Sequence, residues 1–574
     1  MTDQEPGYVR PLSEDGTPDM DALTASQPRS RRGAVIGGVV LAVVAAGAVG
    51  GVVLWRSLVG SAFAATEAVP PDADFVVTLD LLQVRDSEQL ARLVSAFTGP
   101  AVDQGLMDAD DADWLTRLDE VLFEEAGFTL ADDVAPWIGR SVSIAGWLPD
   151  GFDFANPYAG DEPGGVLVVS VRDRDGAAAF LDKLVSTLEE SSGAAAVRSS
   201  LRGGELVAVD DDSDSDLNLQ LLGFYGYLDD ERLILATSRD GIERGLDARD
   251  GESLADDADF AALMDALPAN RLVAGYVATD WVADAVRSAP LDGEAPAGID
   301  QFIATIDETG AFAGSITLEG GGVAFDLVAP AVEGRSSVDA SVLTFPERLP
   351  DETLAFFGSP LPDDAIATGL ESLRDLDPFL YDDTVGGLEE MLGFDLVGDV
   401  LPALGREIVV AAVGTPEGMF SDQFGVDIGI VGGIGVLDRA PVEDAVRALE
   451  DLAAEGGISV RSLGNVSVIG DEFSDFFAYG VGDDALAVGS GPAVVEALLS
   501  GSGDPVTTTP LYRQLDGLLP GDGMVLYVDM HGIYDAVNWQ DPERGILDPL
   551  VGIGAADETT GGLVHGRLMV LVDY

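Results

Sequence analysis

The chain carries one stretch of fourteen residues twice: GFTLADDVAPWIGR at residues 127–140 and GFDLVGDVLPALGR at residues 393–406. Both copies follow the pattern G-F-x-L-x-x-D-V-x-P-x-[IL]-G-R, and they lie 266 positions apart without a gap. A shared pattern of this length predicts that the chain contains two copies of one folding unit. We call this stretch the signature, and the rest of the chain is organised around it.

We interpret the signature as a structural corner rather than an active site. Its aspartate is suited to cap the amino terminus of a short helix, with the proline in the first turn. Its last glycine would close that helix in the left-handed conformation before a strand begins at the arginine. A single catalytic centre would need only one intact copy, so the repetition favours a role in folding. The signature residues are Gly127, Phe128, Asp133, Pro136, Gly139 and Arg140 in the first copy, and Gly393, Phe394, Asp399, Pro402, Gly405 and Arg406 in the second.

Further correspondences extend the repeat over most of the chain. The openings Pro71–Leu79 and Pro350–Phe357 are 279 positions apart, whereas the Asp-Glu-Thr sequences at 307–309 and 557–559 are 250 apart. Offsets that fall steadily are what insertions and deletions in the loops of one ancestral duplication produce. In each half, strand-like runs outnumber amphipathic helical segments and lack the regular alternation of a parallel sheet. The sequence therefore predicts an α+β fold with a duplicated ectodomain of two similar halves, each a largely antiparallel sheet with amphipathic helices.

A hydrophobic run near the amino terminus predicts a membrane anchor. Residues 33–55 contain no charge, and as a helix they would span about 34 Å, enough for the roughly 30 Å hydrocarbon core. Three arginines precede the run and one follows it, so we expect a single-pass protein of the cell membrane with a cytoplasmic amino terminus and an extracytoplasmic ectodomain. The predicted organisation is a disordered tail (1–32), a transmembrane helix (33–56), a tether (57–68), the first half (69–328), a linker (329–348) and the second half (349–574).

Two features of this region leave alternatives open. A cleaved signal peptide competes with a retained anchor, because Ala62-Phe63-Ala64 forms an A-x-A cleavage site. The hydrophobic run is long for a signal peptide, which favours retention. The G-x-x-x-G spacings at 33–37 and 47–51 would allow dimerisation through the span, although in a segment this rich in glycine such spacing is often incidental.

Composition excludes several classes of function. The chain has a formal net charge of −72, from 102 acidic and 30 basic residues, so it would repel nucleic acid and anionic lipid head groups. The acidity and the scarcity of lysine fit either a GC-rich genome or a high-salt habitat. The chain contains no cysteine, which excludes disulfides, thiolate metal sites and thiol catalysis.

The sequence contains none of the common catalytic or cofactor-binding motifs. It has no phosphate-binding loop, no G-x-S-x-G nucleophile motif and no H-E-x-x-H zinc motif. His531 lies between a predicted strand and a predicted helix, where capping or surface exposure is expected. The densest acidic run offers a calcium-loop candidate through Asp212, Asp214 and Asp216, but Leu217 stands where such a loop needs glycine. A solvated loop is the simpler interpretation, so we expect no cofactor, no catalytic residue and no metal site.

The signature and its context resemble the family of domain of unknown function 3352, whose members are single-span exported bacterial proteins. The resemblance rests on the opening at Pro71–Val76 and on the Asp-Val-x-Pro-Trp-Ile-Gly stretch at Asp133–Gly139. It would cover roughly residues 69–574, with Ala403 in place of the tryptophan in the second copy. It implies a membrane-tethered α+β ectodomain outside the cytoplasm, and it carries over no catalytic residue.

Three functions remain open from the sequence. The first is a non-enzymatic, membrane-anchored binding or envelope-assembly module with an unidentified envelope partner or ligand, since two similar halves can form a shared cleft. The second is a carrier for lipid or another apolar envelope molecule in a cleft between sheet and helices. The third is a carboxylate-dependent hydrolase acting on cell-wall glycans, which requires two carboxyl groups about 5–10 Å apart. The lack of catalytic motifs favours the first.

Overall fold

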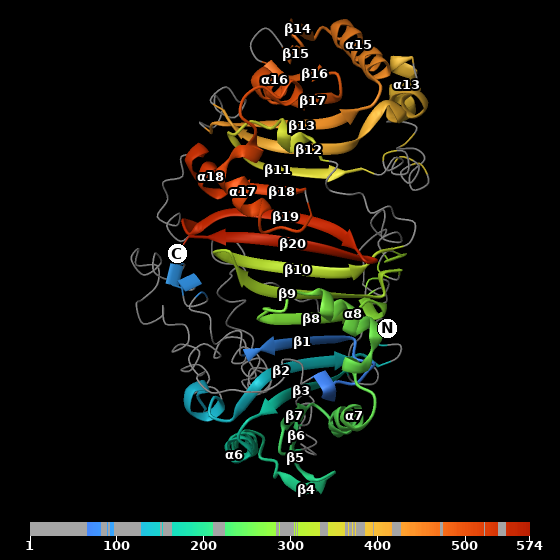
Figure 1. Cartoon of the computed structure of the whole chain (residues 1–574). Coiled ribbons are helices and arrows are strands. Elements are labelled where there is room, and N and C mark those ends of the chain that lie inside the picture. Colours follow the sequence, from blue (N-terminus) through green and yellow to red (C-terminus); the bar gives the residue numbers. More distant parts are fainter. Residues whose placement is uncertain are drawn as a thin grey trace, which may run out of the picture.

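The structure is a computed structural model of the chain, shown in Figure 1. It describes residues 66–81, 128–149, 163–209, 224–282, 308–332, 343–361, 385–393, 395–415, 426–470, 475–521, 523–537 and 547–573, with single residues and pairs between 89 and 96 and at 152, 286, 303–304, 306, 366, 370, 374 and 381. The predicted tail, the predicted span and most of the tether lie outside the described residues. No helix within the described ranges is both long enough and apolar enough to cross a bilayer.

Twenty strands, all within the described residues, form one sheet. Ten come from the first half: β1 (Phe75–Asp80), β2 (Ile138–Trp147), β3 (Gly164–Val171), β4 (Val197–Leu201), β5 (Gly204–Val209), β6 (Phe224–Leu228), β7 (Arg232–Ala236), β8 (Val273–Ala278), β9 (Ala311–Glu319) and β10 (Gly322–Pro330). Ten come from the second half: β11 (Thr353–Pro360), β12 (Leu404–Gly414), β13 (Ile428–Val436), β14 (Ser459–Leu463), β15 (Val466–Gly470), β16 (Asp475–Val481), β17 (Ala485–Gly489), β18 (Leu526–Asp529), β19 (Leu550–Thr560) and β20 (Leu563–Val572).

The two halves arrange their strands in the same order. The first half runs β4-β5-β6-β7-β3-β2-β1-β8-β9-β10 across the sheet. The second runs β14-β15-β16-β17-β13-β12-β11-β18-β19-β20. Every one of these pairs is antiparallel, and Figure 1 shows the strands stacked from β14 at one end to β4 at the other. The predicted α+β class with antiparallel pairing is confirmed.

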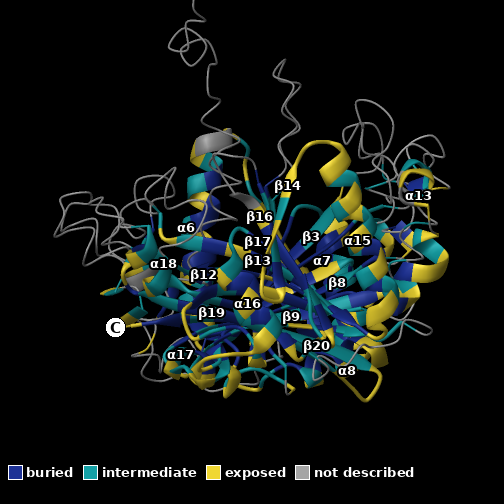
Figure 2. Cartoon of the chain, turned by 90° about the horizontal axis from the view of Figure 1, so that it is seen from above, coloured by how far each residue is buried: buried dark blue, intermediate teal, exposed yellow. Residues whose placement is uncertain are grey.

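Helices cover both sides of this sheet. The α-helices that the structure describes are α6 (Arg174–Ser192), α7 (Arg239–Asp250), α8 (Ala258–Ala266), α13 (Gly387–Leu392), α15 (Arg439–Glu455), α16 (Pro492–Ser500), α17 (Pro510–Asp516) and α18 (Met530–Ala536). In the first half α6 packs on one side, and α7 and α8 pack on the other. In the second half α15 lies on the side of α6, whereas α16 and α17 lie on the side of α7 and α8. Figure 2 shows buried residues concentrated in the strands between these layers.

The strand β3 shows why a continuous apolar run forms a central strand. Leu167 and Val169 pack in the core beneath α6, whereas Val166 and Val168 pack in the core beneath α7 and α8. Because alternate side chains point to opposite faces, a strand covered on both sides needs apolar residues at every position. The helix α6 follows directly, with Asp173 as its N-cap.

The two halves join where β10 pairs with β20. Val77 and Phe357 are equivalent, because their partners Ile144 and Val410 are separated by the 266 positions of the signature. The strand pairings that lead outward from Val77 reach β10, and those that lead outward from Phe357 reach β20. Along these pairings, each residue of β10 is equivalent to the residue of β20 that lies 241 positions later in the chain. Residue 326 of β10 is therefore equivalent to residue 567 of β20, and the two stand directly opposite each other. A local two-fold axis passes between them.

Two details of the predicted repeat need correction. The offset between equivalent residues around β1 and β11 is 279 up to Thr353 and 280 after it. The change arises because Leu354 is an extra, bulged residue that β1 lacks. The Asp-Glu-Thr correspondence is wrong: Thr309 precedes β9, whereas residues 557–559 lie inside β19. In a chain with so many Asp and Glu residues, two short acidic sequences can match by chance. At the predicted linker, β10 extends to Pro330, two residues past the predicted boundary.

Candidate functional site

The signature forms a corner in both copies, but its last glycine acts differently from the prediction. Gly139 and Gly405 lie inside β2 and β12, and neither has a positive φ. A Cβ at Gly139 would lie 2.7 Å from the carbonyl oxygen of Ser170, and one at Gly405 would lie 2.8 Å from Cα of Gly435. The predicted left-handed conformation is therefore wrong. Glycine is required because the neighbouring strand approaches too closely for a side chain.

The helix cap of the signature also differs from the prediction. A π-helical turn follows Thr129 (η3, Leu130–Val134) and Asp395 (η8, Leu396–Val400) in the two copies. The side chains of Thr129 and Asp395 each accept a hydrogen bond from the backbone N–H three residues later, at 3.2 and 2.5 Å. Asp133 instead accepts from the N–H of Thr129 at 2.8 Å, and Asp399 is exposed. The cap thus stands four positions before the predicted aspartates.

The prolines and the first glycine of the signature have separate roles. Pro402 lies in the first turn of a short 3-10 helix (η9, Leu401–Ala403), as predicted. Pro136 lies in the turn between η3 and β2. Gly393 ends α13 in the left-handed conformation, with a φ of 76°. Gly127 and Phe394 lie outside the described residues.

The aromatic residues of the signature are packing residues. Phe128 and Trp137 are 0% and 2% exposed, and their rings lie 5.4 and 5.2 Å from that of Phe180 in α6. Arg140 forms an ion pair with Asp80 of β1, with 2.8 Å between Nη2 and Oδ2. Arg140 and Asp80 also line a cavity of about 260 Å³ beside α8. Arg406, in the second copy, is exposed and provides its carbonyl oxygen to the N–H of Leu361.

The other predicted site residues give little chemistry. Asp212, Asp214 and Asp216 lie outside the described residues. His531 is exposed in α18, as predicted, with Nε2 3.0 Å from the carbonyl oxygen of Asp548. Within the described ranges, no group of three or more His, Asp or Glu side chains could hold a metal ion.

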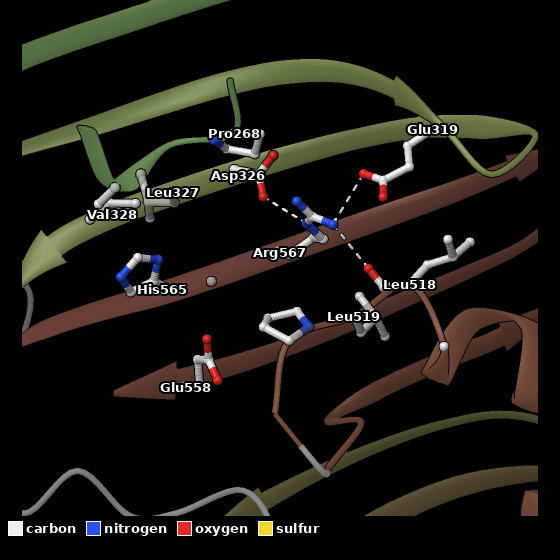
Figure 3. Close-up of a pocket in the computed structure, with 14 residues that line it drawn as sticks. Pro268, Glu319, Asp326, Leu327, Val328, Leu518, Leu519, Glu558, His565 and Arg567 are labelled. Atoms are coloured by element: carbon white, nitrogen blue, oxygen red, sulfur yellow. Dashed lines mark hydrogen bonds and ion pairs between the residues drawn. The ribbon is translucent and has the colours of Figure 1, made fainter. Parts of the chain in front are cut away.

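A cleft of about 350 Å³ lies at the junction of the two halves. Its floor is formed by β10 and β20, as Figure 3 shows. Residues after α8 and α17 line it from either side, including the equivalent prolines Pro268 and Pro520. The polar side chains that line it are Glu319, Asp326, Glu558, His565 and Arg567. The sequence predicted a shared cleft between the halves but none of these residues, because their meeting depends on the β10–β20 register.

Arg567 is the central polar residue of this cleft. Its Nε lies 2.7 Å from Asp326 Oδ1, and its Nη1 lies 3.3 Å from Glu319 Oε2 (Figure 3). Its Nη1 also donates to the carbonyl oxygen of Leu518 at 3.0 Å. The guanidinium therefore joins β9 and β10 of the first half to the loop after α17. These contacts occupy the cation with internal partners, which favours a role in holding the halves together.

The second candidate site is the side of the sheet opposite α8 and α17. Residues directly opposite each other on paired strands share a face, so the register defines rows across the sheet. One row crosses twelve strands and both halves, and all of its members are apolar. It consists of Val142, Leu79, Val273, Ile316, Phe325, Leu568, Ala555, Leu526, Phe357, Val410, Gly432 and Val488. We call this side of the sheet the apolar face.

Large side chains of the apolar face are exposed. Eight of them are between 36% and 54% exposed: Phe75, Val77, Phe325, Leu327, Phe357, Val410, Ile430 and Val488. Single exposed apolar residues are common on proteins, but a contiguous group over many strands is typical of a binding surface. The sequence predicted these strands, but the alternation within a strand does not tell which of its faces a helix covers.

Comparisons with known proteins place the chain in a family. A comparison with curated proteins gives no match. Two solved structures are similar in part: crystal form I of TP0453 (TM-score 0.23, 9% identity, 50% of this chain and 83% of that chain) and crystal form IV of TP0453 (TM-score 0.22, 9% identity, 47% and 81%). Likeness at these TM-scores supports no argument about fold or function. A family model described as "Protein of unknown function (DUF3352)" matches residues 35–556. The chain therefore belongs to the DUF3352 family, as the signature suggested.

Proposed function

We propose that this chain is a non-enzymatic binding protein that holds an apolar molecule, such as a lipid acyl chain, on its apolar face. The observation that carries the proposal is the row of apolar positions across twelve strands, in which Phe357 and Val410 are more than half exposed, at 53% and 54%. Covering apolar surface is favourable by about 25 cal/mol per Å². A ligand that lies across the strands gains affinity from each strand that it covers.

The chemistry of the apolar face favours a hydrocarbon over a polar partner. Backbone N–H and C=O groups of the interior strands are already paired within the sheet. A polar group placed there would lose its hydrogen bonds to water and find few replacements, which is costly. Protein–protein interfaces usually carry about one hydrogen bond per 100–200 Å². A second copy of the chain is also disfavoured as an occupant, because two molecules of net charge −72 repel each other.

The location and the origin of the binding surface are part of the proposal. The uncharged run at 33–55 would anchor the ectodomain outside the cytoplasm, at the membrane surface where apolar envelope molecules are found. One ancestral duplication would explain why two halves with the same strand order contribute to one face. Protease added outside intact cells should digest the ectodomain and spare the amino-terminal tail; a fully protected chain would contradict this orientation.

Native mass spectrometry of the full chain tests the binding function. The chain is purified from its own membranes in mild detergent, and the bound fraction is extracted for lipid analysis. We expect wild-type chain to retain an apolar molecule and the double variant Phe357→Ser/Val410→Ser to lose it. Val197→Ser/Leu437→Ser serves as the control, because these residues are 66% and 67% exposed outside the apolar face. A ligand-free wild-type chain, or equal retention by both double variants, would contradict the proposal.

A further inference from the structure

Asp557 lies on the apolar face, at the junction of the two halves. It belongs to β19 and is paired with Gly566 of β20, which is paired in turn with Leu327 of β10. The same row continues through Gly314 of β9 and Gly275 of β8. Directly opposite residues share a face, so Asp557 stands at the end of a row whose other members here are glycine and leucine.

This row has little side-chain cover along its length. A Cβ at Gly566 would meet no atom within 4 Å, and the atoms nearest to a Cβ at Gly275 and Gly314 are backbone oxygens at 3.7 and 3.2 Å. The five strands from β8 to β19 span about 19 Å at roughly 4.8 Å per strand. One leaflet of a bilayer has a hydrocarbon thickness of about 15 Å, half of the whole core. A single acyl chain therefore fits along the row.

Asp557 has no partner among the described residues to satisfy its charge. Within the described part of the chain, its carboxylate takes part in no hydrogen bond or ion pair. Burial raises the pKa of Asp557, and among the described residues no donor or cation opposes that shift. An ionised carboxylate on an apolar surface is costly unless a ligand or solvent pairs with it. Asp557 is thus a hydrogen-bond acceptor available to a molecule bound on this row.

We propose that Asp557 binds the protonated amine head group of a single-chain amphiphile whose hydrocarbon chain lies along the row from Gly566 towards Gly275. The inference rests on the proposed function, since it uses the same apolar face. Charge complementarity selects the head group, because a chain of net charge −72 attracts cations and repels carboxylate and phosphate groups. An ammonium group carries three donors and no acceptor, which matches a carboxylate that only accepts.

The test compares three ligands that share one hydrocarbon chain: dodecylamine, dodecanol and dodecanoic acid. Their affinities for the full chain are measured by titration calorimetry below micelle-forming concentrations at neutral pH. We expect the amine to bind about tenfold more tightly than the alcohol, the size of one charge-assisted hydrogen bond, and the acid to bind most weakly. Asp557→Asn should lower the affinity for the amine about tenfold and leave that for the alcohol unchanged.

The neighbouring Glu558 provides a matched control. It points to the junction cleft on the other side of the sheet, so Glu558→Gln removes the same charge from the chain without touching the row. The affinity of the Glu558→Gln variant for the amine should equal that of the wild-type chain. If Glu558→Gln weakens the amine as much as Asp557→Asn does, general attraction to an acidic protein explains the preference and the inference is overturned.

A third variant separates failure of this inference from failure of the proposed function. Leu327→Ser should weaken the amine and the alcohol alike, because it removes an apolar contact of the chain rather than of the head group. If amine and alcohol bind with equal affinity and Leu327→Ser weakens both, the role of Asp557 is overturned. The apolar face would still be the binding surface. Binding of the amine alone, insensitive to Leu327→Ser, would overturn the proposed function as well.

Discussion

Asp326 and Arg567 face each other across the β10–β20 pair, and they are equivalent residues of the two halves. Their side chains are 9% and 17% exposed and meet at 2.7 Å. If two identical halves paired in this way, the same residue would face itself and two like charges would meet. The oppositely charged pair removes that repulsion, so it favours the pairing of two different halves over two identical ones.

Reversal of either charge in this pair should destabilise the chain. Asp326→Arg and Arg567→Asp each leave like charges in a largely buried place, which we expect to cost about 3 kcal/mol in urea unfolding. The double variant Asp326→Arg/Arg567→Asp should recover at least half of the stability that either single variant loses. If its loss instead equals the sum of the two single losses, the pairing is contradicted. Arg198→Asp, at an exposed ion pair, should change stability by less than about 1 kcal/mol.

The last glycine of the signature should not tolerate any side chain. Gly139→Ala and Gly405→Ala each place a Cβ against the next strand, so we expect a loss of about 1–3 kcal/mol, and at least as much for valine. Gly432→Ala, inside β13, is the control, because its Cβ would have no neighbour closer than 3.8 Å. If Gly432→Ala lowers the melting temperature as much as the other two variants do, then lost backbone flexibility, and not contact with the next strand, causes the effect.

The position of the helix cap can be tested by alanine substitution. Thr129→Ala and Asp395→Ala remove the side chains that accept the N–H three residues later, and each should cost about 1 kcal/mol. Asp399→Ala removes an exposed carboxylate and should be close to neutral. If instead Asp399→Ala proves the most destabilising of the three in chemical denaturation, the cap assigned here is incorrect.

Trp137 and its counterpart Ala403 should respond in opposite ways to exchange. Trp137→Ala empties a buried site beside Phe180 and should cost about 3–5 kcal/mol. Ala403→Trp would overfill a buried site beside Val436 and Val442, costing about 1–3 kcal/mol or more. Circular dichroism melting of both variants checks this, and a stabilising Ala403→Trp would mean that the second corner has room for the aromatic ring.

Asp557 should make the ligand-free chain less stable as pH rises. Its folded pKa is raised above the ordinary value of 3.8, so the folded chain holds a proton that the unfolded chain has already released. Stability is therefore lost as pH rises from about 3.8 through the raised pKa. We expect Asp557→Asn to melt above wild type at pH 7 and the difference to vanish below pH 3.8. A variant that melts below wild type at neutral pH would indicate a stabilising partner for the carboxylate.

The sequence by itself determined the class of the fold, a mixture of helices and antiparallel strands. The apolar run of β3 and the N-cap at Asp173 specify local structure through residues close together in the chain. The signature likewise marked equivalent corners, since local sterics and packing preserve such a pattern. Its glycine and aspartate were assigned the wrong roles, because the contact of Gly139 with Ser170 and the contact of Asp133 with Lys183 come from β3 and α6.

Only the tertiary structure decided which surfaces meet and which stay exposed. A strand alternates between two faces, and nothing within it tells which face a helix covers. The β10–β20 register places Asp326 opposite Arg567, 241 positions later in the chain, and a shift of one residue would turn every side chain to the opposite side. The pairing of Asp326 with Arg567 and the place of Asp557 on the apolar face both follow from that register. Local sequence cannot encode it, because it depends on the packing of the two complete halves.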